Sequence, residues 1–216
     1  MARRSYNQFC GLAGALDLVG ERWTLLVVRE LMTGPKRYTD LADALPGIGT
    51  SLLASRLKRL EEDGICRRDY LAPPAASAVY ALTDVGDELG RALMPLIRWG
   101  LRHAVPEEPG PGTTIGPDWP LLGITYDVDP AALEDIDATY KFVVEGRAAY
   151  LRIRDGRAIV LHGEADREPD ATVTLDAATV AAVGSGRSSA LDAAEAGRIS
   201  INGDQAAVDD LIRALG

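Results

Sequence analysis

Residues 47–65, GIGTSLLASRLKRLEEDGI, place small and charged side chains at helical spacing. At about 100° per residue, Leu53, Leu57 and Leu60 share one face of a helix, and we expect that face to be buried. Small or polar side chains allow close approach to the base edges of DNA, and lysine and arginine bind its phosphates. An ordinary surface helix with a solvated charged face fits the same pattern, so both interpretations stay open at this point. The opposite face carries Ser51, Ala54, Ser55, Lys58 and Arg59.

Other reactive residues form no pattern that we can assign to catalysis or to metal binding. The segment GSGRSS does not match the G-x-S-x-G turn of serine hydrolases, and GIGTSL lacks the third glycine of a dinucleotide-binding loop. Neither cysteine lies in a C-x-x-C motif, and His103 and His162 are far apart in the sequence. We therefore expect no metal site, no cofactor and no enzyme activity.

The chain of 216 residues has a formal net charge of −9, which would oppose DNA binding if it were evenly spread. Residues 1–104, however, contain 14 Lys and Arg against 12 Asp and Glu, whereas residues 105–216 contain 9 against 20. The stretch AVPEEPGPGTTIGPD between these halves is dense in proline and glycine, as linkers often are. We therefore predict two domains, 1–104 and 119–216, joined by a linker at 105–118.

The composition favours a protein of the reducing cytoplasm. Two cysteines, Cys10 and Cys66, make no disulfide framework, and no apolar run approaches the length of a membrane span. The N-terminal MARRSYNQFCG has no apolar segment after its arginines, so we expect neither a secretory leader nor attachment to a membrane.

Residues 1–104 are predicted to be mostly helical. Apolar spacing predicts helices in LAGALDLVG, in ERWTLLVVRELMTG and in YTDLADALPG, where we expect Thr39 to be the cap. The segments ICRRDYL and AVYALT predict two short strands, and a long helix follows from near Thr83. Helices followed by a two-stranded hairpin predict a mainly-α winged helix-turn-helix, with 38–45 and 50–62 as the helix pair and PGIG as the turn. In the helix predicted in ERWTLLVVRELMTG we expect one face to carry Trp23, Leu26, Val27 and Leu31.

Six motifs in residues 1–104, taken in order, resemble the HxlR family of winged-helix transcriptional regulators. They are LDLVGERWTLLVVREL, GPKRYTDL, LPGI, LLASRLKRLEEDGI, YALTDVG and LIRWG, and they cover about residues 9–103. The resemblance implies a DNA-binding regulator that forms a homodimer through its terminal helices, here 9–19 and 84–103. It also implies a roughly palindromic double-stranded operator, with half-sites about one helical turn apart.

The resemblance makes the polar face of helix 50–62 a candidate recognition surface. We expect phosphate contacts from basic residues on and around this helix, while Arg56 either contacts DNA or braces the domain internally. The expected wing, PPAASAVY, is neutral where the family usually has an arginine after paired prolines, so we expect the helix to carry more of the recognition. The predicted DNA-contacting residues are Lys36, Arg37, Thr50, Ser51, Ala54, Ser55, Lys58, Arg59, Arg67 and Arg68.

Cys10 directly precedes the first predicted helix, where some members of the family use a cysteine to sense oxidants or electrophiles. A helix N-terminus and the nearby Arg3 and Arg4 could lower the pKa of such a thiol. The alternative is a small buried residue at the dimer interface, since free cysteines are usually buried. Cys66 lies on a predicted strand, and we expect it in the core.

Residues 119–216 predict an α+β domain. We expect a strand in LLGITYDV, a short helical turn in DPAALEDIDA, and three strands in TYKFVVEGRAAYLRIRDGRAIVLHG that turn at EG and DG. The rest predicts a strand, two alanine-rich helices, a short strand and a final helix. The motifs YLRIRDG, TVTLD and GRISINGD resemble the SCP2-like (sterol carrier) domain over most of residues 120–216.

The SCP2-like resemblance implies a sheet and helices around an apolar tunnel that holds a lipid-like molecule. A packed core explains the same apolar residues. We predict a dimeric DNA-binding regulator that a small apolar ligand modulates. The alternatives are a thiol-based sensor that acts through Cys10, and a lipid-like carrier or enzyme that uses the winged domain only for dimerisation. The candidate lining residues are Phe142, Val144, Leu151, Ile153, Ile159, Val173, Val180, Val183, Leu191 and Leu211.

Overall fold

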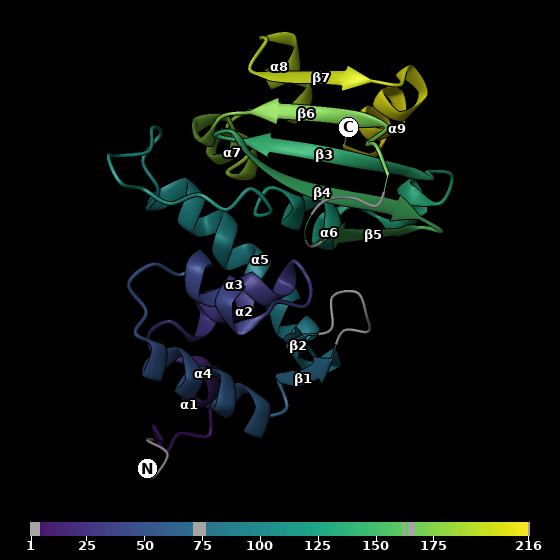
Figure 1. Cartoon of the computed structure of the whole chain (residues 1–216). Coiled ribbons are helices and arrows are strands. Elements are labelled where there is room, and N and C mark those ends of the chain that lie inside the picture. The colour runs from purple at the N-terminus through teal and green to yellow at the C-terminus, as the bar shows by residue number, and fades with distance from the viewer. Residues whose placement is uncertain (1–4, 71–76, 162, 164–166, 216) are drawn as a thin grey trace. The chain divides into compact units, whose positions relative to one another are not determined.

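The structure is a computed structural model that describes residues 5–70, 77–161, 163 and 167–215 (Figure 1). The chain forms two compact units, 1–90 and 91–216, and the division falls within the long helix α5 (Asp84–His103). The predicted linker at 105–118 contains neither helix nor strand, while the domain boundaries placed around it stay predictions. Among the described residues, no helix combines the length and the apolar character that crossing a bilayer requires.

The N-terminal unit contains the expected helices and strand pair. In chain order the elements are α1 (Gly11–Val19), α2 (Thr24–Met32), α3 (Tyr38–Ala44), α4 (Thr50–Glu62), β1 (Cys66–Tyr70) and β2 (Ala78–Leu82), followed by α5. The two strands pair antiparallel, with Arg68 opposite Tyr80. This order confirms the prediction of a helix-turn-helix followed by a hairpin. The expected wing tip, residues 71–76, lies outside the described residues.

The apolar face of α4 lies at the centre of the N-terminal core, as predicted. Leu53, Leu57 and Leu60 are each at most 1% exposed, and α4 packs against α2 and β1. Each buried leucine contributes roughly 1.5–3 kcal/mol to folding, so these three residues hold the helix firmly in place. The prediction for α2 was partly wrong, because Leu26 is exposed and lies on the side of the helix opposite the buried Leu31.

The turn between α3 and α4 depends on glycine. Gly47 has a φ of 94°, a conformation that residues with a Cβ rarely adopt, and Gly49 is the N-cap of α4. The start of α3 differs from our prediction. Its N-cap is Arg37, whose backbone N–H donates to the Asp40 carboxylate at 2.9 Å, and Thr39 lies within the first turn, so Thr39 is not the cap.

The C-terminal unit is built on a five-stranded sheet of order β5-β4-β3-β6-β7. Strands β3 and β6 pair in parallel, and the other neighbours pair antiparallel. The described residues thus confirm an α+β architecture. The strands are β3 (Ala138–Val144), β4 (Arg147–Arg154), β5 (Arg157–Leu161), β6 (Ala171–Leu175) and β7 (Ile199–Gly203). The helices are α6 (Leu121–Asp127), the 3-10 turn η1 (Pro130–Leu133), α7 (Ala177–Gly184), α8 (Ala190–Glu195) and α9 (Gln205–Leu215).

One element of this unit was predicted wrongly. The segment LLGITYDV, expected to be a strand, forms α6. Leu121 and Ile124, three residues apart, both lie in the core, which is helical rather than alternating spacing. A short apolar run of this length does not distinguish a strand from a buried helix, so its packing partners decide the outcome.

The core of the C-terminal unit lies on one face of the sheet. Alternate residues of β3, such as Tyr140 and Phe142, pack with residues of β4 and β6 and with α6 and α9. The hydroxyl of the fully buried Tyr140 donates to the carbonyl oxygen of Ala207 at 3.0 Å, so its polar end is satisfied. Burial raises the pKa of this tyrosine to about 12.

Candidate nucleic-acid interface

The face of α4 that we predicted to contact DNA is open to solvent. Thr50, Ser51, Ala54 and Ser55 are all exposed, and the side chain of Lys58 is 77% exposed. The ammonium of Lys58 lies 3.7 Å from the carboxylate of Glu62 one turn later. Because both side chains of this pair are well exposed, it contributes only a few tenths of a kcal/mol and leaves the lysine ammonium accessible to a phosphate.

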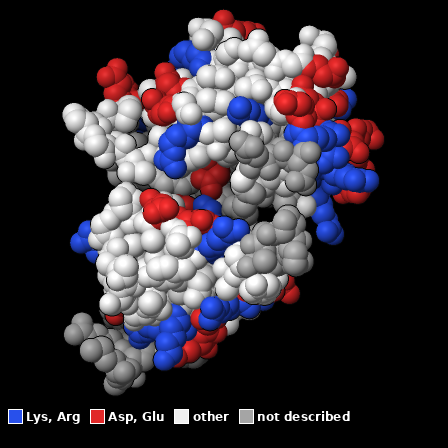
Figure 2. All heavy atoms as spheres, viewed as in Figure 1, with Lys and Arg blue, Asp and Glu red and all other residues white. Residues whose placement is uncertain are grey.

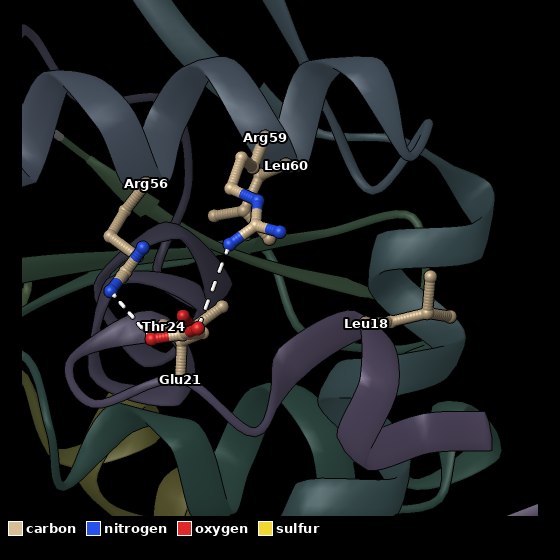
Figure 3. Close-up of a pocket in the computed structure, with 6 residues that line it drawn as sticks. All are labelled: Leu18, Glu21, Thr24, Arg56, Arg59 and Leu60. Atoms are coloured by element: carbon tan, nitrogen blue, oxygen red, sulfur yellow. Dashed lines mark hydrogen bonds and ion pairs between the residues drawn. The ribbon is translucent and has the colours of Figure 1, made fainter. Parts of the chain in front are cut away.

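The two arginines of α4 behave differently from Lys58. Arg56 is buried, and its guanidinium donates to the carbonyl oxygen of Arg22 at 3.2 Å and to the carboxylate of Glu21 at 3.0 Å. Of the two roles left open for it, Arg56 therefore takes the internal one. Arg59, three residues later, lies 3.8 Å from the same carboxylate (Figure 3). Glu21 was not among the predicted site residues.

Lys36 does not lie where we predicted. It is only 6% exposed, and its ammonium lies 2.7 Å from the buried carboxylate of Glu30. Its backbone N–H and carbonyl oxygen exchange hydrogen bonds with Tyr80 of β2, at 2.9 and 2.8 Å. Lys36 thus ties the segment before α3 to the hairpin, and its burial contradicts the prediction that it binds phosphate.

The remaining predicted cations are exposed beside α4. Arg37 donates from Nε to the hydroxyl of Ser77 at 2.8 Å, and Arg67 donates to the carbonyl oxygen of Leu82 at 2.8 Å. Arg68 is exposed on the neighbouring position of β1. Figure 2 shows Lys and Arg gathered over α4 and β1, with Asp and Glu among them. The surface is therefore mixed in charge rather than uniformly basic.

One contact outside our prediction orients the helix pair. The hydroxyl of Tyr38, at the start of α3, donates to the carbonyl oxygen of Thr50 at the start of α4, at 2.8 Å. The contact holds the exposed N-terminal turn of α4 against α3. No sequence pattern signals it, because the two residues become neighbours only when the turn between them folds back.

Comparison with known proteins shows which protein family contains this helix pair. Residues 18–108 match the family model described as HxlR-like helix-turn-helix. The chain is 33% identical to the HTH-type transcriptional regulator YodB of Bacillus subtilis over 101 residues, which cover 46% of this chain and 90% of YodB. The chain belongs to the HxlR-like helix-turn-helix family. Its homologues are transcriptional regulators, so membership supports DNA binding by the N-terminal unit.

Further similarities concern the same half of this HxlR-like chain. The HTH-type transcriptional regulator YvaP of Bacillus subtilis is 34% identical over 85 residues, which cover 39% of this chain and 79% of YvaP. The crystal structure of quinone-bound YodB from B. subtilis matches with 32% sequence identity and a TM-score of 0.36. The match covers 41% of this chain and 93% of the YodB chain.

The two cysteines of this HxlR-like chain have opposite environments. Cys10 is exposed at the N-cap of α1, and the backbone N–H groups of Ala13 and Leu12 in the first turn of that helix lower the pKa of its thiol. Cys66 is buried in β1, and burial raises the pKa of its thiol to about 12. Cys66 is in the core as predicted. Within the single chain Cys10 is not the buried residue of our alternative, and Arg3 and Arg4 lie outside the described residues.

The apolar residues predicted to line a tunnel do not share one environment. Phe142, Leu151, Ile153, Val173 and Leu211 belong to the packed core, and Val144 is fully buried. Val180 and Val183 of α7 are half-buried. Two assignments were wrong, since Ile159 and Leu191 are 56% and 50% exposed. The core interpretation therefore accounts for most of these residues.

A hollow of about 350 Å³ is present elsewhere in the C-terminal unit, where β6 ends and β7 begins near the β3–β4 turn. Its carboxylates already have structural roles. Glu145 accepts the backbone N–H of Ala177 at 2.9 Å, and hydrogen bonds from the side chain and backbone of Thr179 lower the pKa of Asp176. The hollow is lined by Glu145, Gly146, Thr174, Leu175, Asp176, Gly197, Arg198 and Ser200.

The C-terminal unit has a comparison of its own. Residues 122–216 match the family model described as alkyl sulfatase C-terminal. The SCP2-like assignment therefore stays a prediction. Among the described residues, no group of His, Cys, Asp and Glu is arranged to hold a metal ion.

Proposed function

We propose that the chain is a transcriptional regulator that places α4 in the major groove of double-stranded DNA. The observation that supports this most is the exposed run of Ser51, Ala54, Ser55 and Lys58 on a helix anchored by buried leucines. Small side chains at the N-terminal end of such a helix allow its backbone to approach base edges, and the lysine further along suits a phosphate. Belonging to the HxlR-like family supports the same role independently.

The exposed arginines beside α4 complete the proposed contact surface. Arg37 precedes α3, and Arg67 and Arg68 lie on β1, so cations flank α4 from both neighbouring segments. Their guanidinium groups suit phosphate oxygens, which position a protein on DNA without reporting its sequence. We exclude Lys36 from this surface because it is buried against Glu30.

We further propose that the regulator acts as a homodimer that pairs through α1 and α5. Leu12, Leu16 and Leu18 are exposed on α1, and Leu96 and Trp99 are exposed on α5. Large apolar side chains gathered on exposed helices are typical of protein interfaces. A two-fold pair presents two copies of α4 and therefore suits a roughly palindromic operator.

Salt-dependent binding to the promoter region of its own gene tests the proposed function. We expect Lys58→Ala to weaken binding and to reduce the slope of log K against log salt by about 0.9, the value for one lost phosphate contact. Ser55→Ala should weaken binding to the promoter more than binding to unrelated DNA. Arg157→Ala removes an exposed cation from the C-terminal unit and should change neither quantity. If Lys58→Ala and Ser55→Ala both bind like the natural protein, α4 is not the recognition helix.

A second candidate function is electrophile sensing through Cys10. It is supported by the exposure of this thiol and by its place at the N-terminus of α1, where backbone N–H groups lower its pKa. YodB, a relative by sequence, has a quinone-bound crystal structure. We propose that the Cys10 sulfur adds to a ring carbon of a quinone. The thiol proton goes to one quinone oxygen, and the hydrogen of the attacked carbon moves to the other as the ring becomes aromatic, which gives a thioether hydroquinone without any further oxidant or reductant.

DNA release after quinone treatment tests this candidate. The natural protein and Cys66→Ser should both lose DNA affinity on incubation with benzoquinone, whereas Cys10→Ser should keep it. Equal release from Cys10→Ser would refute sensing by this residue. A small apolar ligand of the C-terminal unit stays a prediction, which native mass spectrometry of protein purified from its own cells tests.

A further inference from the structure

A carboxylate from outside the helix-turn-helix pair holds both arginines of α4. Glu21 lies between α1 and α2, and its oxygens lie 3.0 Å from a guanidinium nitrogen of Arg56 and 3.8 Å from one of Arg59. Figure 3 shows the Glu21 side chain facing both guanidinium groups from below the helix. The gap among these residues, Leu18, Thr24 and Leu60 has a volume of about 10 Å³. It has room for a single water at most, so the cluster is not a ligand site.

The two arginines differ in what else surrounds them. The side chain of Arg56 is 11% exposed and also donates to the Arg22 carbonyl oxygen, so it is committed to the interior. The side chain of Arg59 is 37% exposed. On a helical wheel Arg59 lies about 40° from Ser55, on the edge of the face proposed to contact DNA. Arg59 is thus the cation of α4 that can form an ion pair either with Glu21 or with a DNA phosphate.

The position of Glu21 is specified by the segment that follows it. Trp23, the N-cap of α2, has a φ of 79°, an unusual left-handed conformation for a residue with a bulky side chain. The guanidinium of Arg22 lies over the Trp23 ring at 5.5 Å from its centroid. Backbone strain of this kind persists only where the surrounding structure imposes it. Glu21 therefore meets α4 from a defined direction.

We propose that Glu21 is a positioning residue that keeps the Arg59 guanidinium from DNA phosphates. The segment between α1 and α2 then sets how many cations α4 presents to DNA. This inference rests on the proposed role of α4 in DNA binding. Because a phosphate and a carboxylate compete for the same guanidinium, loss of the Glu21 charge adds one cation to the contact surface.

Binding to a fluorescein-labelled duplex of arbitrary sequence tests the proposal, because nonspecific affinity reports phosphate contacts. We expect Glu21→Gln to bind several-fold more tightly at low salt and to steepen the salt slope by about 0.9, one added contact. The gain should disappear when Arg59→Ala is combined with Glu21→Gln. Glu168→Gln, the same loss of charge at an exposed residue of the C-terminal unit, should not produce the gain.

A second variant keeps the test independent of folding. Arg59→Ala alone should leave the salt slope unchanged, whereas a flattening as large as that caused by Lys58→Ala would overturn the proposal. A tighter Glu21→Gln complex that does not depend on Arg59, or no gain at all, would also overturn it while leaving α4 as the recognition helix. If the natural protein shows no salt-dependent binding, both proposals fail together.

Discussion

Two charged clusters in the N-terminal unit differ in their burial. In the first, Glu30 and Lys36 lie 2.7 Å apart with side chains only 1% and 7% exposed. In the second, Glu21 and Arg59 lie 3.8 Å apart with side chains 49% and 37% exposed. Both clusters include a residue that we predicted to bind DNA. Only the second leaves its cation within reach of solvent, so a basic residue near a recognition helix is not thereby available for DNA.

The physical reason for the difference is desolvation. The buried Lys36 ammonium has lost its hydrating water, and its contact with the Glu30 carboxylate compensates for that loss. Moving Lys36 to a phosphate would take one of its two cations from the buried Glu30 carboxylate and leave only Arg29. Water can solvate Glu21 when Arg59 leaves, because about half of its side chain is exposed. The first cluster is therefore structural, whereas in the second the pair between Glu21 and Arg59 can be broken without leaving a buried charge.

The largest effect is expected when the buried cluster is broken. Glu30→Gln keeps the shape of the side chain but leaves the Lys36 ammonium without its carboxylate, and the nearby Arg29 guanidinium, 2.5 Å from Glu30, loses it too. We expect the free energy of unfolding to fall by about 3–5 kcal/mol. Urea denaturation monitored by circular dichroism measures it.

Glu62→Gln is the matched control for this prediction. It removes the same charge from an exposed pair, with side chains 77% and 61% exposed, and should change the free energy of unfolding by less than about 0.5 kcal/mol. A loss for Glu30→Gln that is no larger than this would show that the buried pair is not a structural requirement. The buried cluster would then not differ from the exposed one in its contribution to stability.

The two cysteines extend the comparison to reactivity. At pH 8 we expect Cys10 to react with iodoacetamide at least about 100-fold faster than Cys66, because the thiolate is the reactive form. The rate for Cys10 should rise with increasing pH, and the midpoint of that rise should lie below 9.0, the ordinary pKa of a cysteine thiol. The rate for Cys66 should rise only as the pH nears about 12. Mass spectrometry of peptides over a pH series measures both.

The sign of each pKa shift also predicts a pH dependence of folding. Cys66 has a raised pKa in the folded state, so its contribution to stability is complete below pH 9.0 and is lost as the pH rises toward about 12. Cys66→Ala should therefore show a smaller alkaline loss of stability than Cys10→Ala. Equal losses for the two variants would contradict the assigned environments.

A smaller effect is expected within the second cluster. Arg56→Lys removes the hydrogen bond to the Arg22 carbonyl oxygen and weakens the contact with Glu21, and we expect a loss of about 1–2 kcal/mol. Arg59→Lys should cost less than about 0.5 kcal/mol, because its pair is more exposed and longer. Thermal unfolding of the two variants compares them directly, and equal losses would mean that both arginines brace the domain.

The smallest effect on stability is expected at the proposed contact surface. Lys58→Ala should change the free energy of unfolding by at most about 0.5 kcal/mol, since the lysine is 77% exposed, although it should weaken DNA binding. Urea denaturation and anisotropy on the same preparation measure the two quantities. A large loss of stability would mean that Lys58 supports the fold rather than the DNA contact.

The elements of the N-terminal unit were largely predictable because their signals are periodic and long. The bounds of α4 match the predicted helix at 50–62, and its leucines are buried as their spacing indicated. LLGITYDV was mistaken for a strand because its apolar run is too short to show a period. The exposure of the polar residues on α4 was predictable for the same reason that its core face was, while their contacts with DNA stay a prediction.

Contacts between segments were not predictable from the same patterns. Lys36 looks like any basic residue after a helix, and only the placement of Glu30 and β2 around it shows that it is buried. Glu21 begins the predicted helix in ERWTLLVVRELMTG, where nothing in the spacing points to residues 56 and 59. Partners that are far apart in sequence leave no local signature.

The order of residues alone settled the helix-turn-helix pair, the exposed polar face of α4 and the division of charge between the two halves. These follow from local periodicity and composition, which each segment carries within itself. The folded chain had to decide which cations remain free, which thiol is exposed and whether the apolar residues of the C-terminal unit pack against one another. Those outcomes depend on burial, and burial is created by neighbours that the chain brings together only when it folds.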